Sequence, residues 1–167
     1  MSEVVECNKM FYKDHVKPFE PHFIDLLGND MCQADQDEVY ATCGNSPKTG
    51  LVSSIMCSEK LVCYFDKDTL IGIGGVGKEQ DGNGIPWFLR TNYFHSWKRK
   101  NLRSFLNSTK SWIEHMGESY PSMHNYVDLR NKESQNWLKH LGFRLTKTID
   151  NYGYLKIPFI KFEKYNG

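Results

Sequence analysis

The sequence predicts a mixed α/β (α+β) fold in which helices flank a mostly antiparallel central sheet. Short apolar runs at residues 61–65, 69–73 and 85–89 alternate with turn-forming residues, which indicates three consecutive antiparallel strands. A long segment with helical apolar periodicity follows, and then a strand, a helix and two more strands. A strand–helix–strand step places one parallel pair within an otherwise antiparallel sheet.

Composition and length fit one globular domain, which we expect to cover residues 1–167. Hydrophobic residues make up 40% of the chain and charged residues 25%, enough apolar material for an ordinary core. The formal net charge of +1 gives no overall attraction for nucleic acid. No signal-peptide layout and no apolar run near the ~20 residues of a membrane span are present, so we expect a cytoplasmic protein. The five cysteines form no C-x-x-C pair, which predicts reduced thiols and no metal site.

The first third of the chain predicts a strand and three helices. Residues 4–11 are a plausible strand, and residues 16–27 carry apolar side chains with Gly28-Asn29 as a stop signal. A second helix is expected over residues 35–42, ending at Gly44. Asn45-Ser46-Pro47 then begins a short third helix, because Ser is a good N-cap and Pro suits the first helical position.

The glycines between Gly72 and Gly77 satisfy the pattern G-x-G-x-x-G. In a dinucleotide-binding domain a helix must open on those glycines, whereas here a charged turn and another strand follow. We therefore interpret the segment as a glycine-rich strand.

The second half contains the strongest helix. Its apolar residues recur at helical spacing, and Gly117 ends it; they are Leu102, Phe105, Leu106, Trp112, Ile113 and Met116. The basic residues lie mostly before this stripe or on the other face; they are Lys98, Arg99, Lys100, Arg103 and Lys110. Beyond it we expect a strand at 123–127, a helix at 132–141, and strands at 143–148 and 154–164.

The segment from Asn125 to Phe143 carries a specific signature. Asn131 is followed eleven and twelve residues later by Gly142 and Phe143, with a helix between. This resembles the C-terminal signature of the GNAT (N-acetyltransferase-like) superfamily, in which the glycine supplies a left-handed helix cap. The resemblance implies a GNAT fold with splayed strands near residues 85–89 and 123–127, and acetyl-CoA as the cofactor.

A narrower resemblance covers roughly residues 35–145. It rests on four runs, Asp37-Glu38-Val39, Ser58-Glu59-Lys60, Pro86–Leu89 and Asn125–Lys132, and is closest to the acetyltransferase-like internal virion proteins of T7-like short-tailed bacteriophages. It implies a place in the host cytoplasm or the phage virion. The implied partners are other phage virion proteins or a host protein, with no specific nucleic acid and no membrane span.

Two positions depart from the pattern of active GNAT enzymes. Such enzymes place an Arg/Gln-x-x-Gly-x-Gly/Ala loop before the long helix, so that backbone N–H groups approach the cofactor's pyrophosphate. The corresponding loop, residues 90–100, contains no glycine, which argues against the usual binding of acetyl-CoA. Leu138 stands seven residues after Asn131, where many of these enzymes carry a tyrosine as general acid, and leucine cannot donate a proton.

The candidate site residues follow from this comparison. The sequence cannot fix a catalytic residue; Tyr126, Asp128 and His124 near the splayed strand are weak candidates, and each can equally be an ordinary core or surface residue. The candidate cofactor-binding residues are Lys98, Arg99, Lys100 and Asn131, because the basic cluster can pair with phosphates. A solvated helix start explains the same cluster.

Three functions are compatible with the sequence. The favoured one is a virion-associated or accessory phage protein, a degenerate acetyltransferase that acts structurally or in virion assembly and DNA ejection. The first alternative is an active acetyl-CoA-dependent N-acetyltransferase, that is, an acyltransferase. The second is a host-protein-binding module whose anchors are Tyr93, Phe94 and Trp97, unless these aromatic residues fill the cofactor cleft from inside.

Overall fold

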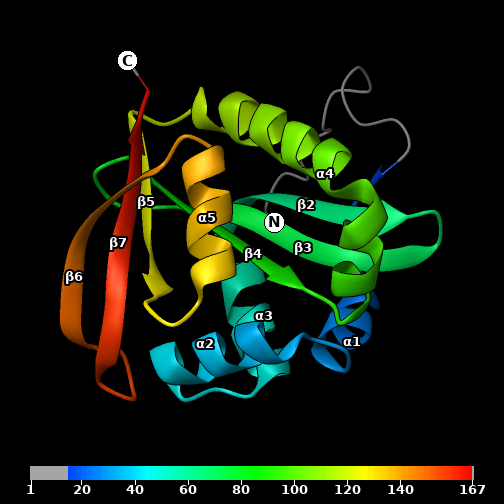
Figure 1. Ribbon diagram of the computed structural model, residues 1–167, viewed down its shortest axis with the longest axis horizontal. Coiled ribbons are helices and arrows are strands. Elements are labelled where there is room, and N and C mark those ends of the chain that lie inside the picture. Colours follow the sequence, from blue (N-terminus) through cyan, green and yellow to red (C-terminus); the bar gives the residue numbers. More distant parts are fainter. Residues whose placement is uncertain (1–14, 167) are drawn as a thin grey trace.

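The computed structural model describes residues 15–166, and its elements follow the predicted order (Figure 1). The helices are α1 Phe23–Gly28, α2 Gln33–Cys43, α3 Pro47–Met56, α4 Tyr93–Gly117 and α5 Lys132–His140. The strands are β1 Val16–Lys17, β2 Ser58–Asp66, β3 Thr69–Lys78, β4 Gly84–Arg90, β5 Ser122–Asp128, β6 Arg144–Tyr152 and β7 Ile157–Tyr165. The strand expected over residues 4–11 lies outside the described residues.

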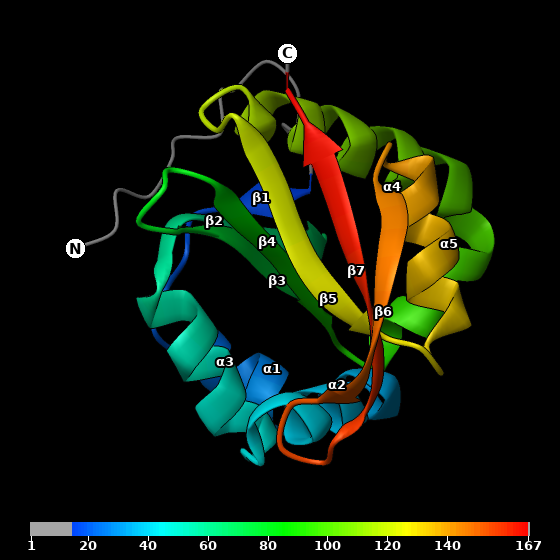
Figure 2. The same ribbon diagram turned by 90° about the vertical axis from the view of Figure 1, so that its left-hand side faces the viewer.

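The strands form one seven-stranded sheet in the order β1-β2-β3-β4-β5-β7-β6. Its pairs are antiparallel except β4 and β5, which run parallel and share a single register pair, Gly84 with Met123. Beyond that pair the two strands diverge, so the predicted mixed sheet with splayed strands is confirmed. Figure 2 shows α4 and α5 on one face of the sheet and α1, α2 and α3 on the other.

Local cap chemistry sets the helix ends as predicted. Gly44 ends α2 in the left-handed conformation with φ 70°, and the Ser46 hydroxyl caps α3 by accepting the N–H of Thr49. At the end of α5, Gly142 has φ 93°, and the N–H of Phe143 donates to the carbonyl of Leu138. That pair of features is a Schellman cap, which turns the chain directly into β6.

The helix expected over residues 16–27 is wrong in its first half. Val16 and Lys17 form β1, which pairs with Tyr64 and Cys63 of β2, and the helix begins only at Phe23. Pro18 disfavours helical geometry at the residue before it and provides no N–H, so the chain stays extended there.

An aromatic cluster fixes α4 on the sheet. Phe105 is 2% exposed and lies at the centre, with ring centroids 5.1 Å from Phe94, 5.8 Å from Trp97 and 5.4 Å from Trp137. Edge-to-face and stacked rings at these separations add to the energy of apolar burial. The first turns of α4 are therefore held by their side chains. Among the described residues, no helix is long and apolar enough to span a membrane.

Replacing Phe105 by alanine should leave a cavity in this cluster and destabilise the protein by about 3–5 kcal/mol. Leu102→Ala is the matched control, because Leu102 lies one turn earlier on α4 and is 46% exposed. That control should cost less than about 1 kcal/mol. Urea unfolding of both variants measures the difference, and equal costs would contradict the assigned faces of the helix.

Candidate functional site

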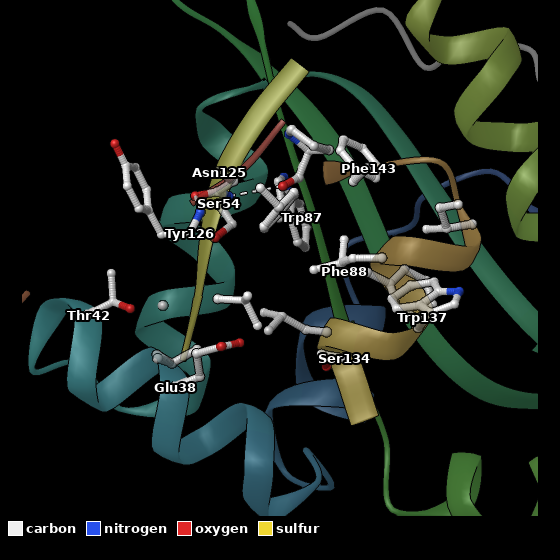
Figure 3. A pocket seen from close by; sticks show the side chains of 18 of the residues that line it. Glu38, Thr42, Ser54, Trp87, Phe88, Asn125, Tyr126, Ser134, Trp137 and Phe143 are labelled. Carbon is white, nitrogen blue, oxygen red and sulfur yellow. Dashed lines mark hydrogen bonds between the residues drawn. The ribbon is translucent and has the colours of Figure 1, made fainter. Parts of the chain in front are cut away.

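A cavity of about 200 Å³ opens where β4 and β5 diverge (Figure 3). Its walls come from the splayed strands, from α2 and α3 on one side and from α4 and α5 on the other. Most of the lining side chains are apolar or aromatic; they include Trp87, Phe88, Trp112, Trp137, Leu138, Leu141 and Phe143. The cleft between residues 85–89 and 123–127 is therefore open.

The side chain of Asn125 bridges the gap between the splayed strands (Figure 3). Its amide nitrogen donates to the carbonyl of Pro86 at 3.0 Å, and its amide oxygen accepts the N–H of Tyr126 at 2.8 Å. These bonds satisfy backbone groups of both strands that an ordinary ladder would have paired. The gap is consequently stable without continuous strand pairing.

The turn between β6 and β7 packs against the end of α2, next to Thr42 and Tyr152, which line the cavity. The N–H groups of Tyr154 and Leu155 donate to the carbonyls of Thr42 and Ala41, each at 3.1 Å. Gly153 lies with φ 69° at this contact, where a Cβ atom would come within 2.5 Å of the Ala41 carbonyl oxygen. The close approach of turn and helix therefore depends on glycine at this position.

Glu38 provides the carboxyl group of the cavity, reaching in from α2 (Figure 3). One of its oxygens accepts the N–H of Asp128 at 2.6 Å. Burial raises the pKa of Glu38 to about 7; the bond from Asp128 and the charge of Arg90 oppose this, while the carboxylates of Asp35 and Asp128 add to it. The group can therefore take up or release a proton near neutral pH.

Of the three weak catalytic candidates, only Tyr126 lines the cavity. Its ring stacks on Tyr152 at 4.8 Å. Asp128 is buried, and both of its carboxylate oxygens accept hydrogen bonds from the guanidinium of Arg130, at 3.0 Å and 2.7 Å. His124 pairs with Glu79 at 3.2 Å, and neither His124 nor Asp128 lines the cavity. The structure thus does not gather these three residues at one place.

The candidate cofactor-binding residues lie on α4 and at the start of α5. The ammonium of Lys98 lies 2.9 Å from a carboxylate oxygen of Glu133 and 5.6 Å from the ring centre of Phe94. Arg99 and Lys100 are exposed on α4. Asn131 caps α5, since its side-chain oxygen accepts the N–H of Ser134 at 3.1 Å. Its buried amide nitrogen has no hydrogen-bond partner within residues 15–166.

The segment 90–100 is mostly helix rather than the expected loop, because α4 already begins at Tyr93. Phe94 and Trp97 are buried beneath α4, so neither of them is a surface anchor, and neither lines the cavity. Tyr93 is partly buried and donates its hydroxyl to Asp66 at 2.8 Å. The helical periodicity of these aromatic residues overrides the expectation of a loop, since their burial around Phe105 stabilises the first turns.

A buried ion network lies at the junction of β4, α4 and α5. Arg90 is 3% exposed; its guanidinium donates to both oxygens of Asp35, at 2.6 and 3.0 Å, and to Glu133 at 3.2 Å. Lys98 adds a second cation on Glu133. The positive charges of Arg90 and Lys98 are thus neutralised by the negative charges of Asp35 and Glu133, so this group of four side chains carries no net positive charge.

The balance of charges at this junction affects the binding of acetyl-CoA, the cofactor that the fold family implies. A pyrophosphate at a helix N-terminus needs free N–H groups and positive charge. At the start of α4 the N–H groups of Phe94 and His95 instead donate to Thr91 and Asn92, at 3.2 and 3.3 Å. Arg90 and Lys98 are already paired with the carboxylates of Asp35 and Glu133. The residues present at this junction therefore do not fit the pyrophosphate.

Sequence reasoning did not single out Glu38, Asp35 or Glu133 as site residues. Asp35 and Arg90 are 55 positions apart, and Glu38 and Asp128 are 90 positions apart. For Glu133 the sequence did contain a local signal. Glu133 lies in the first turn of α5, where the helix dipole stabilises a negative charge.

Comparison with solved structures shows the fold that this chain shares. Ard1 from Thermoplasma volcanium is similar at 16% identity over 90% of this chain and 95% of that chain, with a TM-score of 0.68. RimL, a ribosomal L7/L12 alpha-N-protein acetyltransferase in complex with coenzyme A, is similar at 10% identity, covering 90% and 92%, with a TM-score of 0.64. The microcin C7 self-immunity acetyltransferase MccE, in complex with acetyl-CoA and AMP, is similar at 13% identity over 87% of this chain and 86% of that chain, with a TM-score of 0.60. The predicted GNAT fold is thereby confirmed.

A comparison with protein-family models identifies a family within this fold. Residues 63–149, more than half of the chain, match the family described as "Bacteriophage T7, probable scaffold protein Gp13". The chain belongs to this family. A comparison with curated proteins gives no match.

The raised pKa of Glu38 predicts a stability that depends on pH. The folded protein holds a proton on Glu38 up to about pH 7, whereas an unfolded glutamate releases it near ~4.3. Stability should therefore fall as pH rises through this window. Glu38→Gln should remove that loss and be more stable than the wild type at pH 8 by roughly 1–3 kcal/mol, with little difference at pH 4.

Urea unfolding at pH 4, 6 and 8 measures this effect. Asp37→Asn is the control, because Asp37 is exposed on the same helix, and this variant should keep the pH profile of the wild type. A parallel pH profile for Glu38→Gln and the wild type would contradict the assignment.

Proposed function

We propose that this chain is a phage assembly protein, virion-associated or accessory, that uses the acetyltransferase fold without transferring acetyl groups from acetyl-CoA. The observation that carries the proposal is the start of α4. It has no glycine, its first N–H groups donate within their own turns, and Phe94 and Trp97 are buried around Phe105. A phosphate cannot approach that backbone unless the aromatic core opens.

The position expected to hold a general acid supports the same conclusion. Leu138 is 8% exposed and lines the cavity, so an apolar side chain stands where a proton donor would be needed. The family description as a probable scaffold protein favours a structural role, in virion assembly or DNA ejection. Its partners are then other phage virion proteins, in the host cytoplasm or in the particle.

Titration calorimetry with CoA and with acetyl-CoA tests the first part of the proposal. We expect no saturable binding in the micromolar range, because the junction offers no net positive charge to the pyrophosphate. Micromolar binding of either ligand would refute it.

Quantitative mass spectrometry of procapsids and mature virions tests the assembly role. The protein should co-purify with one or both particles in a fixed ratio to the capsid protein. Its absence from both, together with abundance in the soluble lysate, would count against that role.

An active N-acetyltransferase is the second candidate, and one observation favours it. The open cavity between β4 and β5 holds Glu38, whose pKa of about 7 suits a general base for an amine. Release of free thiol from acetyl-CoA in the presence of an amine or peptide acceptor, lost in Glu38→Gln, would establish this alternative in place of the first.

A further inference from the structure

We propose that Glu133 is a specificity-determining residue, an internal anion that rejects phosphate-bearing ligands and leaves the cavity open to phosphate-free, largely apolar molecules. The inference rests on the proposed function, because it explains which ligands the cleft of a non-acetylating protein still admits.

Glu133 holds the position of a bound anion. It is the second residue of α5, and one oxygen lies 3.2 Å from the guanidinium of Arg90 and 2.9 Å from the ammonium of Lys98. These contacts join the end of β4, the second turn of α4 and the first turn of α5. Two charged donors on one carboxylate oxygen at the N-terminus of a helix make a strong anion position.

The electrostatics show that the ionised carboxylate is the stable occupant. Burial works to raise the pKa of Glu133, yet the hydrogen bond from Lys98 and the charges of Arg90, Lys98 and His95 outweigh it and lower the pKa. Arg90 is 3% exposed and bonded to Asp35, so it cannot turn away to receive another anion. An external phosphate at this position would therefore lie beside the carboxylates of Asp35 and Glu133, which already neutralise Arg90 and Lys98.

The ion pair of Glu133 and Arg90 adjoins the cavity along the chain. Ser134 and Leu89, which follow Glu133 and precede Arg90, both line the cavity, and Trp137 and Leu138 continue the wall along α5. The Glu133 side chain is 44% exposed, so its charge is open to solvent beside this wall. Past this point the lining is mostly aromatic and apolar, which favours uncharged or apolar molecules without phosphate.

Glu133→Gln tests the inference, because it removes the charge while keeping the size and a hydrogen-bond acceptor for Lys98. Titration calorimetry with inorganic pyrophosphate and with CoA is the measurement. We expect the wild type to show no saturable binding in the micromolar range, and Glu133→Gln to bind both ligands at least tenfold more tightly than the limit set by the wild type.

Glu114→Gln is the matched control, since it changes the net charge equally at an exposed position of α4. It should bind neither ligand. In the Glu133→Gln background, Lys98→Ala should abolish the gain and Arg99→Ala should retain it, because Lys98 contacts the carboxylate whereas Arg99 is exposed.

Failure of Glu133→Gln to bind more tightly than the wild type would overturn the inference while leaving the proposed function intact. Tight CoA binding by the wild type, unchanged in Glu133→Gln, would overturn both. Circular dichroism melting establishes that each variant is folded, and Glu133→Ala, for which the same gain is expected, replaces Glu133→Gln if that variant does not melt cooperatively.

Discussion

The guanidinium of Arg90 and the carboxylate of Asp35 form the contact on which the arrangement of the elements depends. The Arg90 side chain donates to both Asp35 oxygens, its backbone N–H donates to the same carboxylate at 2.7 Å, and its carbonyl accepts the N–H of Cys32 at 2.9 Å. The last residue of β4 is thereby joined to α2, and through Glu133 to α5. Loss of one partner would leave the other charge buried and unpaired, which typically costs several kcal/mol.

The cavity follows from this fixed frame. Because the end of β4 is held by α2 rather than by β5, the two parallel strands separate after their single register pair. Asn125 bridges the start of the gap, and Glu38 reaches from α2 to the backbone of Asp128 at its far end. The apolar walls meet a carboxyl group there, which gives this part of the molecule the character of a ligand site.

The junction of β4 and α4 combines the shared fold with local packing of its own. The sheet, the splay and the helix order are those of acetyltransferases, as the similarity to Ard1 and RimL indicates. The residues around the start of α4 form instead an aromatic core and a charge-balanced ion network. A fold can be kept while a site changes, because packing determines the first and a few side chains determine the second.

Much of the architecture was predictable because its signals are local. The left-handed glycines at Gly44 and Gly142 and the Ser46 cap act within a few residues, and the hairpin strands show their own apolar patterns. The errors arose where distant contacts decide, as at Lys17, which pairs with β2, and at Trp97, whose ring packs on Tyr64 of β2 at 5.9 Å. A local pattern contains no information about such partners.

The sequence established the order of most elements and the lack of glycine before the long helix, and its resemblance to GNAT proteins implied the splayed strands. The three-dimensional structure was needed to show that Arg90 is neutralised by Asp35 and Glu133, and that Glu38 lines the cavity whereas His124 and Asp128 do not. These partners are far apart along the chain. A charge matters to a site through its neighbours in space, and here those neighbours are up to 90 positions away.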